Sequence, residues 1–272
     1  MRPGADGETV VLSATEFDVV CEAEGLTERR HVVLTVPSPG ATHDERAELL
    51  ARVWPGLRSR GLAEAATDRV EEDFADLLVL LDRPRLAVDL RIWAPDRSIR
   101  ALGSANGSAG LVTVVDGDLV ELTPVRGGSL AEAVVSVAGD GPPGAGRPVS
   151  LPHEALLDAS ARAGSDLRRF EDELRGFGVV GEDAAALAGM ADGMGMRGQF
   201  GVEHAPSRSA KPHRSDRVVG FHDTPAGRYL HSVRASGDGR LWSTVAPCDN
   251  RRLAEYLHEL VEETTERPPT GC

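Results

Sequence analysis

Residues 108–138 read Ser-Ala-Gly-Leu-Val-Thr-Val-Val-Asp-Gly-Asp-Leu-Val-Glu-Leu-Thr-Pro and then run into a helical pattern that carries Leu130-Ala131-Glu132. Residues 225–263 repeat this order. They read Pro-Ala-Gly, an extended run, Ser-Gly-Asp-Gly, a second extended run that ends in Pro, and a helical pattern that carries Leu253-Ala254-Glu255. Each stretch predicts a β-hairpin followed by a helix, and Asp116-Gly117 is a strong hairpin signal.

The spacing inside the two stretches favours an internal duplication over a chance similarity. Pro124 and Pro247 each stand six residues before the leucine of Leu-Ala-Glu, and the elements before each hairpin also follow a similar order. Duplicated halves usually fold about a pseudo-twofold axis. We therefore expect a platform rather than a single catalytic pocket.

Hydrophobic periodicity outlines two halves that together make one domain over residues 1–263. The halves cover about 10–138 and 147–263, with a Gly/Pro-rich linker at 139–146 and a flexible tail at 264–272. The predicted elements of the first half are a strand at 10–12, a helix or extended run at 15–24 with Ser13 as its N-cap, a strand at 31–36, a helix capped by Thr42 or Asp44, a helix across 70–81, and a strand at 86–93 before a turn at 94–98. Those of the second half are a strand at 149–151, helices from Pro152, at 165–177 and at 182–196, an extended segment at 199–202, and a mobile loop at 205–216. The antiparallel pairs should join into one sheet with helices on one face or at its ends.

Composition narrows the class of protein. The chain has 272 residues, 30 Lys plus Arg against 43 Asp plus Glu, and a net charge of −13. Such an acidic surface repels phosphate backbones and anionic lipid, so we expect neither nucleic acid nor a membrane as partner. The three cysteines lack metal-ligand spacing and predict free thiols in a reducing compartment. No apolar leader or membrane-length apolar stretch is present, so we expect a cytoplasmic protein.

No set of residues in the sequence indicates a catalytic site. His222-Asp223, His231 and Ser232 suggest a Ser/His/Asp arrangement, but neighbouring strand positions face opposite ways and no Gly-x-Ser-x-Gly elbow exists. We favour a turn in which Asp223 bonds the backbone. His204 and His213 have no further ligands at metal spacing, which favours solvent-exposed histidines. We therefore predict no enzyme activity, no cofactor and no metal site.

Two apolar features are candidates for a contact surface. Met190, Met194 and Met196 form a cluster of adaptable side chains, for which ordinary core filling is the alternative. Trp93 stands beside a Pro-Asp turn, and its alternative is burial under a helix.

Several blocks of this chain resemble the EspG family, the cytosolic chaperones of ESX (type VII) secretion in actinobacteria. The resemblance covers about residues 10–263, and its most specific blocks are Gln199-Phe200-Gly201-Val202 and Asp223-Thr224-Pro225-Ala226-Gly227-Arg228. It also includes Trp242, Val245-Ala246-Pro247, His31 to Pro37, Arg60-Gly61-Leu62 and Leu80-Leu81-Asp82-Arg83-Pro84.

The resemblance implies an α+β fold: a central, mostly antiparallel twisted sheet with two helical bundles and quasi-twofold symmetric halves. It also implies a chaperone that binds the apolar tip of the PPE protein in a PE–PPE heterodimer, keeps it soluble and targets it for secretion. The partner-binding residues that it implies by position are Asp89, Arg91, Trp93, Pro95, Asp96, Arg97, Arg100, Met190, Met194 and Met196.

Two other functions stay open at this point. The chain could be a non-chaperone adaptor or scaffold of the same fold that binds other ESX-type substrates or itself, including as a homodimer. It could also be a small-molecule enzyme that uses the His222–His231 region.

Overall fold

The computed structural model of this chain describes residues 7–266. Its strands and helices group into two compact units. The first unit comprises Met1–Arg91, Arg97–Val137 and Glu203–His213, and the second comprises Ile92–Asp96, Ala138–Val202 and Arg214–Cys272. Each unit is made of three separate segments of the chain, so neither is one continuous stretch of sequence. The prediction of a single domain over 1–263 stays a prediction.

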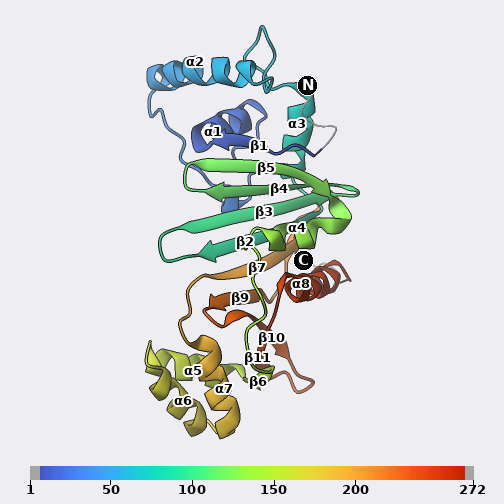
Figure 1. Ribbon diagram of the computed structural model, residues 1–272. Coiled ribbons are helices and arrows are strands. Elements are labelled where there is room, and N and C mark those ends of the chain that lie inside the picture. Colours follow the sequence, from blue (N-terminus) through green and yellow to red (C-terminus); the bar gives the residue numbers. More distant parts are fainter. Residues whose placement is uncertain (1–6, 267–272) are drawn as a thin grey trace. The chain divides into compact units, whose positions relative to one another are not determined.

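The first unit is built on five strands (Figure 1). Their order is β1-β5-β4-β3-β2, and the β1–β5, β5–β4 and β4–β3 pairs are antiparallel. The elements are β1 (Val10–Ser13), α1 (Ala14–Ala23), η1 (Val32–Leu34), α2 (His43–Ser59), α3 (Glu72–Leu78), η2 (Val79–Leu81), β2 (Leu86–Trp93), β3 (Ser98–Asn106), β4 (Ala109–Asp116), β5 (Leu119–Arg126), η3 (Gly127–Ser129) and α4 (Leu130–Ser136).

Side-chain caps set the starts of the first two helices. The Ser13 hydroxyl accepts a hydrogen bond from the Glu16 backbone N–H at 3.1 Å, and the Glu16 carboxylate accepts one from the Ser13 N–H at 2.8 Å. Thr42 and Glu45 form the same reciprocal pair at the start of α2. Such capping boxes satisfy backbone donors that a helix leaves open. The predicted N-cap Ser13 is confirmed, and of the two alternatives Thr42 and Asp44 the cap is Thr42.

The two faces of the first-unit sheet are covered differently. One face packs into a core with α1, α2 and α3. Its strand residues include Leu102, Leu111, Val115, Val120 and Leu122. The other face carries the short helix α4, and a Cβ built on Gly103 would lie 2.4 Å from the Val134 side chain. The absence of a side chain at Gly103 lets α4 approach the sheet closely.

The second unit repeats this plan. Its strands lie in the order β7-β9-β10-β11-β6, so in both units the first strand borders the last and the others follow in reverse. The pairs β7–β9, β9–β10, β10–β11 and β11–β6 are antiparallel. The elements are β6 (Val149–Pro152), α5 (His153–Ala163), α6 (Leu167–Gly176), α7 (Gly181–Ala191), β7 (Arg197–His204), β8 (His213–Arg214), β9 (Val219–Thr224), β10 (Gly227–Ala235), β11 (Leu241–Pro247) and α8 (Asn250–Glu266).

Helices lie on both faces of the second-unit sheet as well. Figure 1 shows α5, α6 and α7 gathered in one bundle, and its core includes Phe170 and Leu174. Tyr229 and Val245 belong to that same core, so they mark the bundle face of the sheet. Helix α8 packs on the other face, where the Arg234 guanidinium lies 5.7 Å from the Tyr256 ring centroid.

The two hairpins have corresponding strand registers although their sequences differ. Pro124 pairs with Leu111 and Pro247 pairs with Tyr229, and each partner is the third residue of its strand. Each hairpin leads into the last helix of its unit, α4 or α8. The predicted α+β fold with antiparallel strands and the repeated order of elements are both confirmed.

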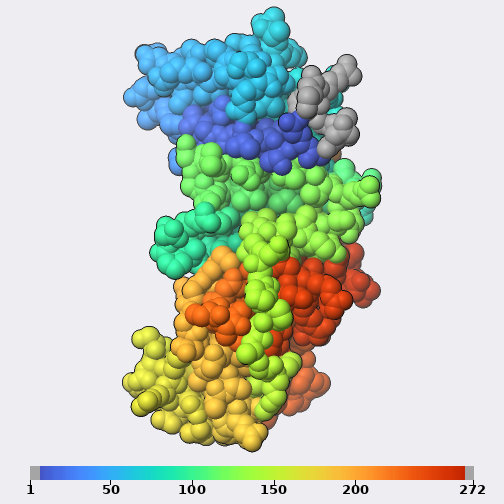
Figure 2. All heavy atoms as spheres, viewed as in Figure 1, coloured from blue at the N-terminus to red at the C-terminus, as the bar shows by residue number. Residues whose placement is uncertain are grey.

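The predicted linker at 139–146 is held along β10. The Arg228 N–H donates to the Pro142 carbonyl at 2.8 Å, and the Gly144 N–H donates to the Arg228 carbonyl at 3.0 Å. A Cβ on Gly144 would lie 2.1 Å from the Tyr229 ring. Figure 2 shows this yellow-green segment on the surface against the orange and red strands of the same unit. The absence of a side chain at Gly144 allows this close packing against β10.

Three predictions of secondary structure are wrong. The strand expected at 31–36 is instead the 3₁₀ turn η1, because the His31 ring caps the Val33 N–H and the Leu34 N–H bonds the His31 carbonyl. The helix expected to reach residue 196 ends at Ala191. Helix α8 continues to Glu266 with Thr264 buried, so the expected tail does not begin at 264, and residues 267–272 lie outside the described part.

Candidate functional site

Two of the predicted contact residues meet in one hollow of the second unit. Trp93 and Met194 line a depression of about 350 Å³, and their exposed fractions are 40% and 45%. Two more exposed or half-buried apolar side chains, Val218 and Val233, lie on its walls. A tryptophan and a methionine left open to solvent beside valines give an adaptable apolar contact surface. We call this depression the Trp93–Met194 hollow.

A row of paired strand residues forms the floor of the hollow. Gln199 on β7 pairs with Gly220 on β9, and Gly220 pairs with His231 on β10. A Cβ on Gly220 would find its nearest atoms at 3.5 Å and beyond, so it would make ordinary van der Waals contacts without a clash. The missing side chain in the middle of this row is what makes the floor low.

Met194 is presented by a turn that is fixed at both ends. The helix before it ends at Ala191. The Gly195 N–H donates to the Asp223 carbonyl at 2.9 Å, and the Asp223 N–H donates to the Met196 carbonyl at 2.8 Å. The His222 ring nitrogen Nε2 lies 2.8 Å from the Met190 carbonyl oxygen, which anchors the last turn of α7. The position of Met194 therefore depends on backbone contacts with the end of β9.

Two histidines in the hollow are held in their neutral forms. Burial lowers the pKa of His222, and its ring stacks on Tyr229 at 5.4 Å between centroids. Burial, together with the neighbouring His153 and His222, lowers the pKa of His231 to about 4. Nε2 of His231 lies 3.2 Å from the Ser243 hydroxyl. These two histidines are therefore uncharged at neutral pH, and the charged side chain on the lining is that of the exposed Arg197.

The Ser/His/Asp arrangement does not form. Both carboxylate oxygens of Asp223 receive hydrogen bonds from Arg228, at 2.7 and 2.9 Å. His222 is bonded to the Met190 carbonyl and His231 to Ser243. The turn at 224–227 is held by the Thr224 hydroxyl, which accepts from the Ala226 N–H and donates to the Gly227 carbonyl. The expectation that Asp223 bonds the turn backbone is therefore wrong, since Thr224 does so.

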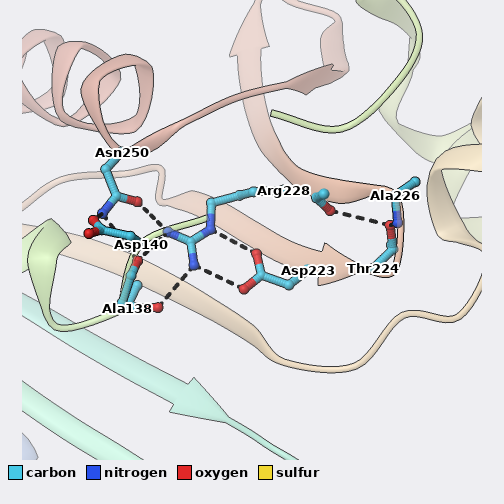
Figure 3. A network of polar contacts seen from close by, with 9 residues as sticks. Ala138, Asp140, Asp223, Thr224, Ala226, Arg228 and Asn250 are labelled. Atoms are coloured by element: carbon cyan, nitrogen blue, oxygen red, sulfur yellow. Dashed lines mark hydrogen bonds and ion pairs between the residues drawn. The ribbon is translucent and has the colours of Figure 1, made fainter. Parts of the chain in front are cut away.

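Arg228 is the centre of a buried polar network (Figure 3). Its side chain is 1% exposed. Besides Asp223, it donates to the Ala138 and Gly139 carbonyls, each at 2.9 Å, and to the Asn250 side chain. All five N–H donors of the guanidinium are thus used. The network ties the start of the 139–146 segment to β9, β10 and α8, so its role is structural.

The other predicted contact residues do not line the hollow. Asp89 and Met190 are buried, at 4% and 3% exposed, and so cannot offer their side chains to a partner at the surface. The remaining positions are half-buried or exposed, and they are Arg91, Pro95, Asp96, Arg97, Arg100 and Met196. Arg97 pairs with Asp116 at 3.0 Å and Arg100 donates to the Thr35 carbonyl at 2.6 Å.

Sequence reasoning missed the strand residues of the floor. Gln199, Gly220 and His231 lie on one face because side chains alternate along strands, and the register joins them. A glycine inside the apolar run of β9 was the one available signal, since it often marks an open or closely approached site.

Other candidate sites give no sign of metal chemistry. Among residues 7–266, no three His, Cys, Asp or Glu side chains gather where they could hold a metal ion. His204 and His213 meet edge to face, 5.9 Å between ring centroids, and both are half-buried rather than exposed as expected. Within the same residues, no helix has both the length and the apolar character needed to span a membrane.

Comparisons with known proteins place the chain in a family. The model of the EspG family matches residues 13–259, so the chain belongs to the EspG family. Among solved structures it is similar to EspG5, the type VII secretion system chaperone of Mycobacterium tuberculosis, determined in complex with the PE25–PPE41 dimer. The TM-score is 0.71 at 17% sequence identity, over 97% of this chain and 98% of that one. No curated protein matches.

Proposed function

We propose that this chain is a substrate-specific chaperone of a type VII (ESX) secretion system. It binds the apolar tip of a PPE protein within a PE–PPE heterodimer, keeps the pair soluble and directs it to secretion. The observation that carries this proposal is the match to the EspG family over residues 13–259. The likeness to EspG5, which was solved with a PE–PPE dimer, supports it across nearly the whole chain.

The Trp93–Met194 hollow is the contact surface that we assign to this role. It combines an exposed tryptophan, an exposed methionine and valines with two neutral histidines, Gln199 and the exposed Arg197. An apolar helical tip would lose water there without facing a buried charge. A large aromatic anchor beside a low floor is the arrangement in which a few residues carry most of the binding energy.

The proposed action is binding rather than catalysis, and its proposed place is the cytosol. Binding alone raises the soluble population of an aggregation-prone partner, so the mechanism needs neither a nucleotide nor a reactive side chain. The histidines of the hollow are engaged with the Met190 carbonyl and the Ser243 hydroxyl, which supports a structural part for them.

Co-expression with a PE–PPE pair encoded in the same genome tests the proposal. The pair should co-purify with this chain and stay soluble only in its presence. Two variants probe the surface: Trp93→Ala removes the anchor, and Gly220→Leu fills the floor. Each should weaken binding by about tenfold or more, the usual cost of losing a central anchor.

Trp242→Ala is the matched control. Trp242 is 39% exposed, close to the 40% of Trp93, and it belongs to the same unit but lies outside the hollow. Its loss should leave binding unchanged. Failure of every encoded PE–PPE pair to co-purify would refute the chaperone role, and capture of another ESX-type substrate would favour an adaptor of the same fold. Equal effects of Trp93→Ala and Trp242→Ala would refute the assignment of the hollow.

A further inference from the structure

A second cavity lies in the first unit, and its lining is rich in positively charged side chains. It encloses about 390 Å³ between the segments around Arg29, Arg83 and Arg208. Lys211, the only lysine of the chain, lies on the same rim. Four cationic side chains thus surround one cavity in a protein whose net charge is −13. Such a cluster attracts anions and raises their local concentration in the cavity.

The carboxylates nearby compensate only part of this charge. Asp82 pairs with Arg29 at 3.6 Å and with Arg208 at 3.4 Å. Glu203 lies on the wall, 3.4 Å from the His31 ring nitrogen Nε2. Three guanidinium groups and one ammonium group therefore face two carboxylates, an excess of two positive charges. Arg83 and Lys211 form no hydrogen bond or ion pair with any residue between 7 and 266.

The backbone at Arg83 gives an independent sign that its side chain is needed. Arg83 has a φ of +53°, and it is the only residue other than glycine with a positive φ among those described. The chain uses glycine at its thirteen other described positions of positive φ. A side chain in this left-handed region is strained, and such strain persists where the side chain has a use. The exposed Arg83 side chain lies on the lining of the cavity.

We infer that this cavity binds a small anion that carries a phosphate group. A dianion would balance the excess of two positive charges, and guanidinium forks match phosphate oxygens with paired hydrogen bonds. The volume falls within the ~300–1,000 Å³ typical of small-molecule sites. Leu81 and Pro84 add an apolar wall that can contact an organic body beside the phosphate. This inference does not depend on the proposed chaperone function.

Isothermal titration of the purified chain with pyrophosphate, inorganic phosphate and ADP, at low ionic strength, tests the inference. Saturable binding of pyrophosphate is expected, because an unpaired arginine and an unpaired lysine remain to receive it. Tighter binding of ADP than of pyrophosphate would support a ligand with an organic body. Equal binding would support recognition of the phosphate group alone.

Two variants separate binding from folding. Arg83→Gly removes the cation and places a glycine where φ is positive, so the melting temperature should stay the same or rise. Lys211→Gln removes the other free cation from an exposed loop. Each should weaken pyrophosphate binding about tenfold, the usual value of one charged hydrogen bond. Arg168→Gln, an exposed arginine on α6, is the matched control and should change nothing.

Three results would overturn the inference. The first is absence of saturable binding for all three anions. The second is equal weakening by Arg168→Gln, which would reduce the effect to general charge. The third is a lower melting temperature for Arg83→Gly, since the strained side chain would then have a structural use.

Discussion

The two units share their strand order and differ in what covers the strands. In both, the first strand borders the last, and a hairpin leads into a closing helix. The closing helix has 7 residues in the first unit and 17 in the second. The second unit also carries the Trp93–Met194 hollow and the Arg228 network.

This difference separates scaffold from function. The shared order needs only alternating apolar strands and two turns, which a duplicated sequence supplies twice. The hollow depends on a turn that presents Met194 and on a glycine in the middle of β9, whereas the strand glycine Gly103 of the first unit lies under α4. The Arg228–Asp223 pair joins two strands beside the hollow. In the first unit the buried carboxylate is Asp18 on α1, which pairs with Arg30 and Arg46, and the pair at the first hairpin, Arg97–Asp116, is exposed.

The largest expected effect comes from breaking the buried network. Arg228→Met leaves Asp223 without its partner and the Ala138 and Gly139 carbonyls without donors. Removing one partner of a buried pair typically costs about 3–5 kcal/mol. The free energy of unfolding, measured by urea titration, should fall by that amount.

The first unit supplies the control for this prediction. Arg97 pairs with Asp116 at 3.0 Å beside the exposed turn of the first hairpin. Arg97→Met should cost less than about 1 kcal/mol, as exposed ion pairs do. Similar losses for the two variants would mean that the Arg228 network contributes no more than a surface pair.

The strands and helices of the scaffold could be predicted from the sequence because the signals for them are local. Asp116-Gly117 marked the first hairpin, Ser13 and Thr42 marked helix starts, and the alternating run at 86–93 gave β2 with its observed bounds. Each of these rests on contacts between residues a few positions apart. The duplication added the pairing of the hairpins with their helices.

The hollow and the path of the 139–146 segment could not be predicted, because they depend on contacts between residues far apart in the sequence. The Arg228 guanidinium bonds carbonyls 89 and 90 positions away, so a Gly/Pro-rich run resembled a free linker. His31 to Val36 had strand composition, but the His31 ring cap favours a 3₁₀ turn. Trp93 and Met194 lie about a hundred positions apart, and only the folded second unit shows that they line one hollow.

A second, smaller effect should appear as the pH falls. His231 is neutral in the folded protein, with a pKa of about 4, whereas an unfolded histidine takes up a proton near the ordinary value of 6.5. Between these values the unfolded chain binds more protons, so the free energy of unfolding decreases as the pH drops. The full loss amounts to about 3 kcal/mol near pH 4.

Urea titrations across this range, on the parent and on His231→Gln, measure the effect. The variant should lose part of the pH dependence and keep the part that comes from His222, whose pKa burial also lowers. Parallel curves for the two proteins would assign the pH dependence to other groups.

The smallest effects are expected at two strand glycines. Gly103 lies under α4, and Gly220 lies in the floor of the hollow. Gly103→Ala should cost about 1–3 kcal/mol, because its Cβ would lie 2.4 Å from Val134 and force α4 away from the sheet. Gly220→Ala should be neutral or gain up to about 1 kcal/mol, because its Cβ meets no atom closer than 3.5 Å and the unfolded chain loses freedom. Urea titration of both variants gives the two signs. A destabilised Gly220→Ala would show that the floor of the hollow is packed, and the surface proposed for the PPE tip would then have to lie elsewhere.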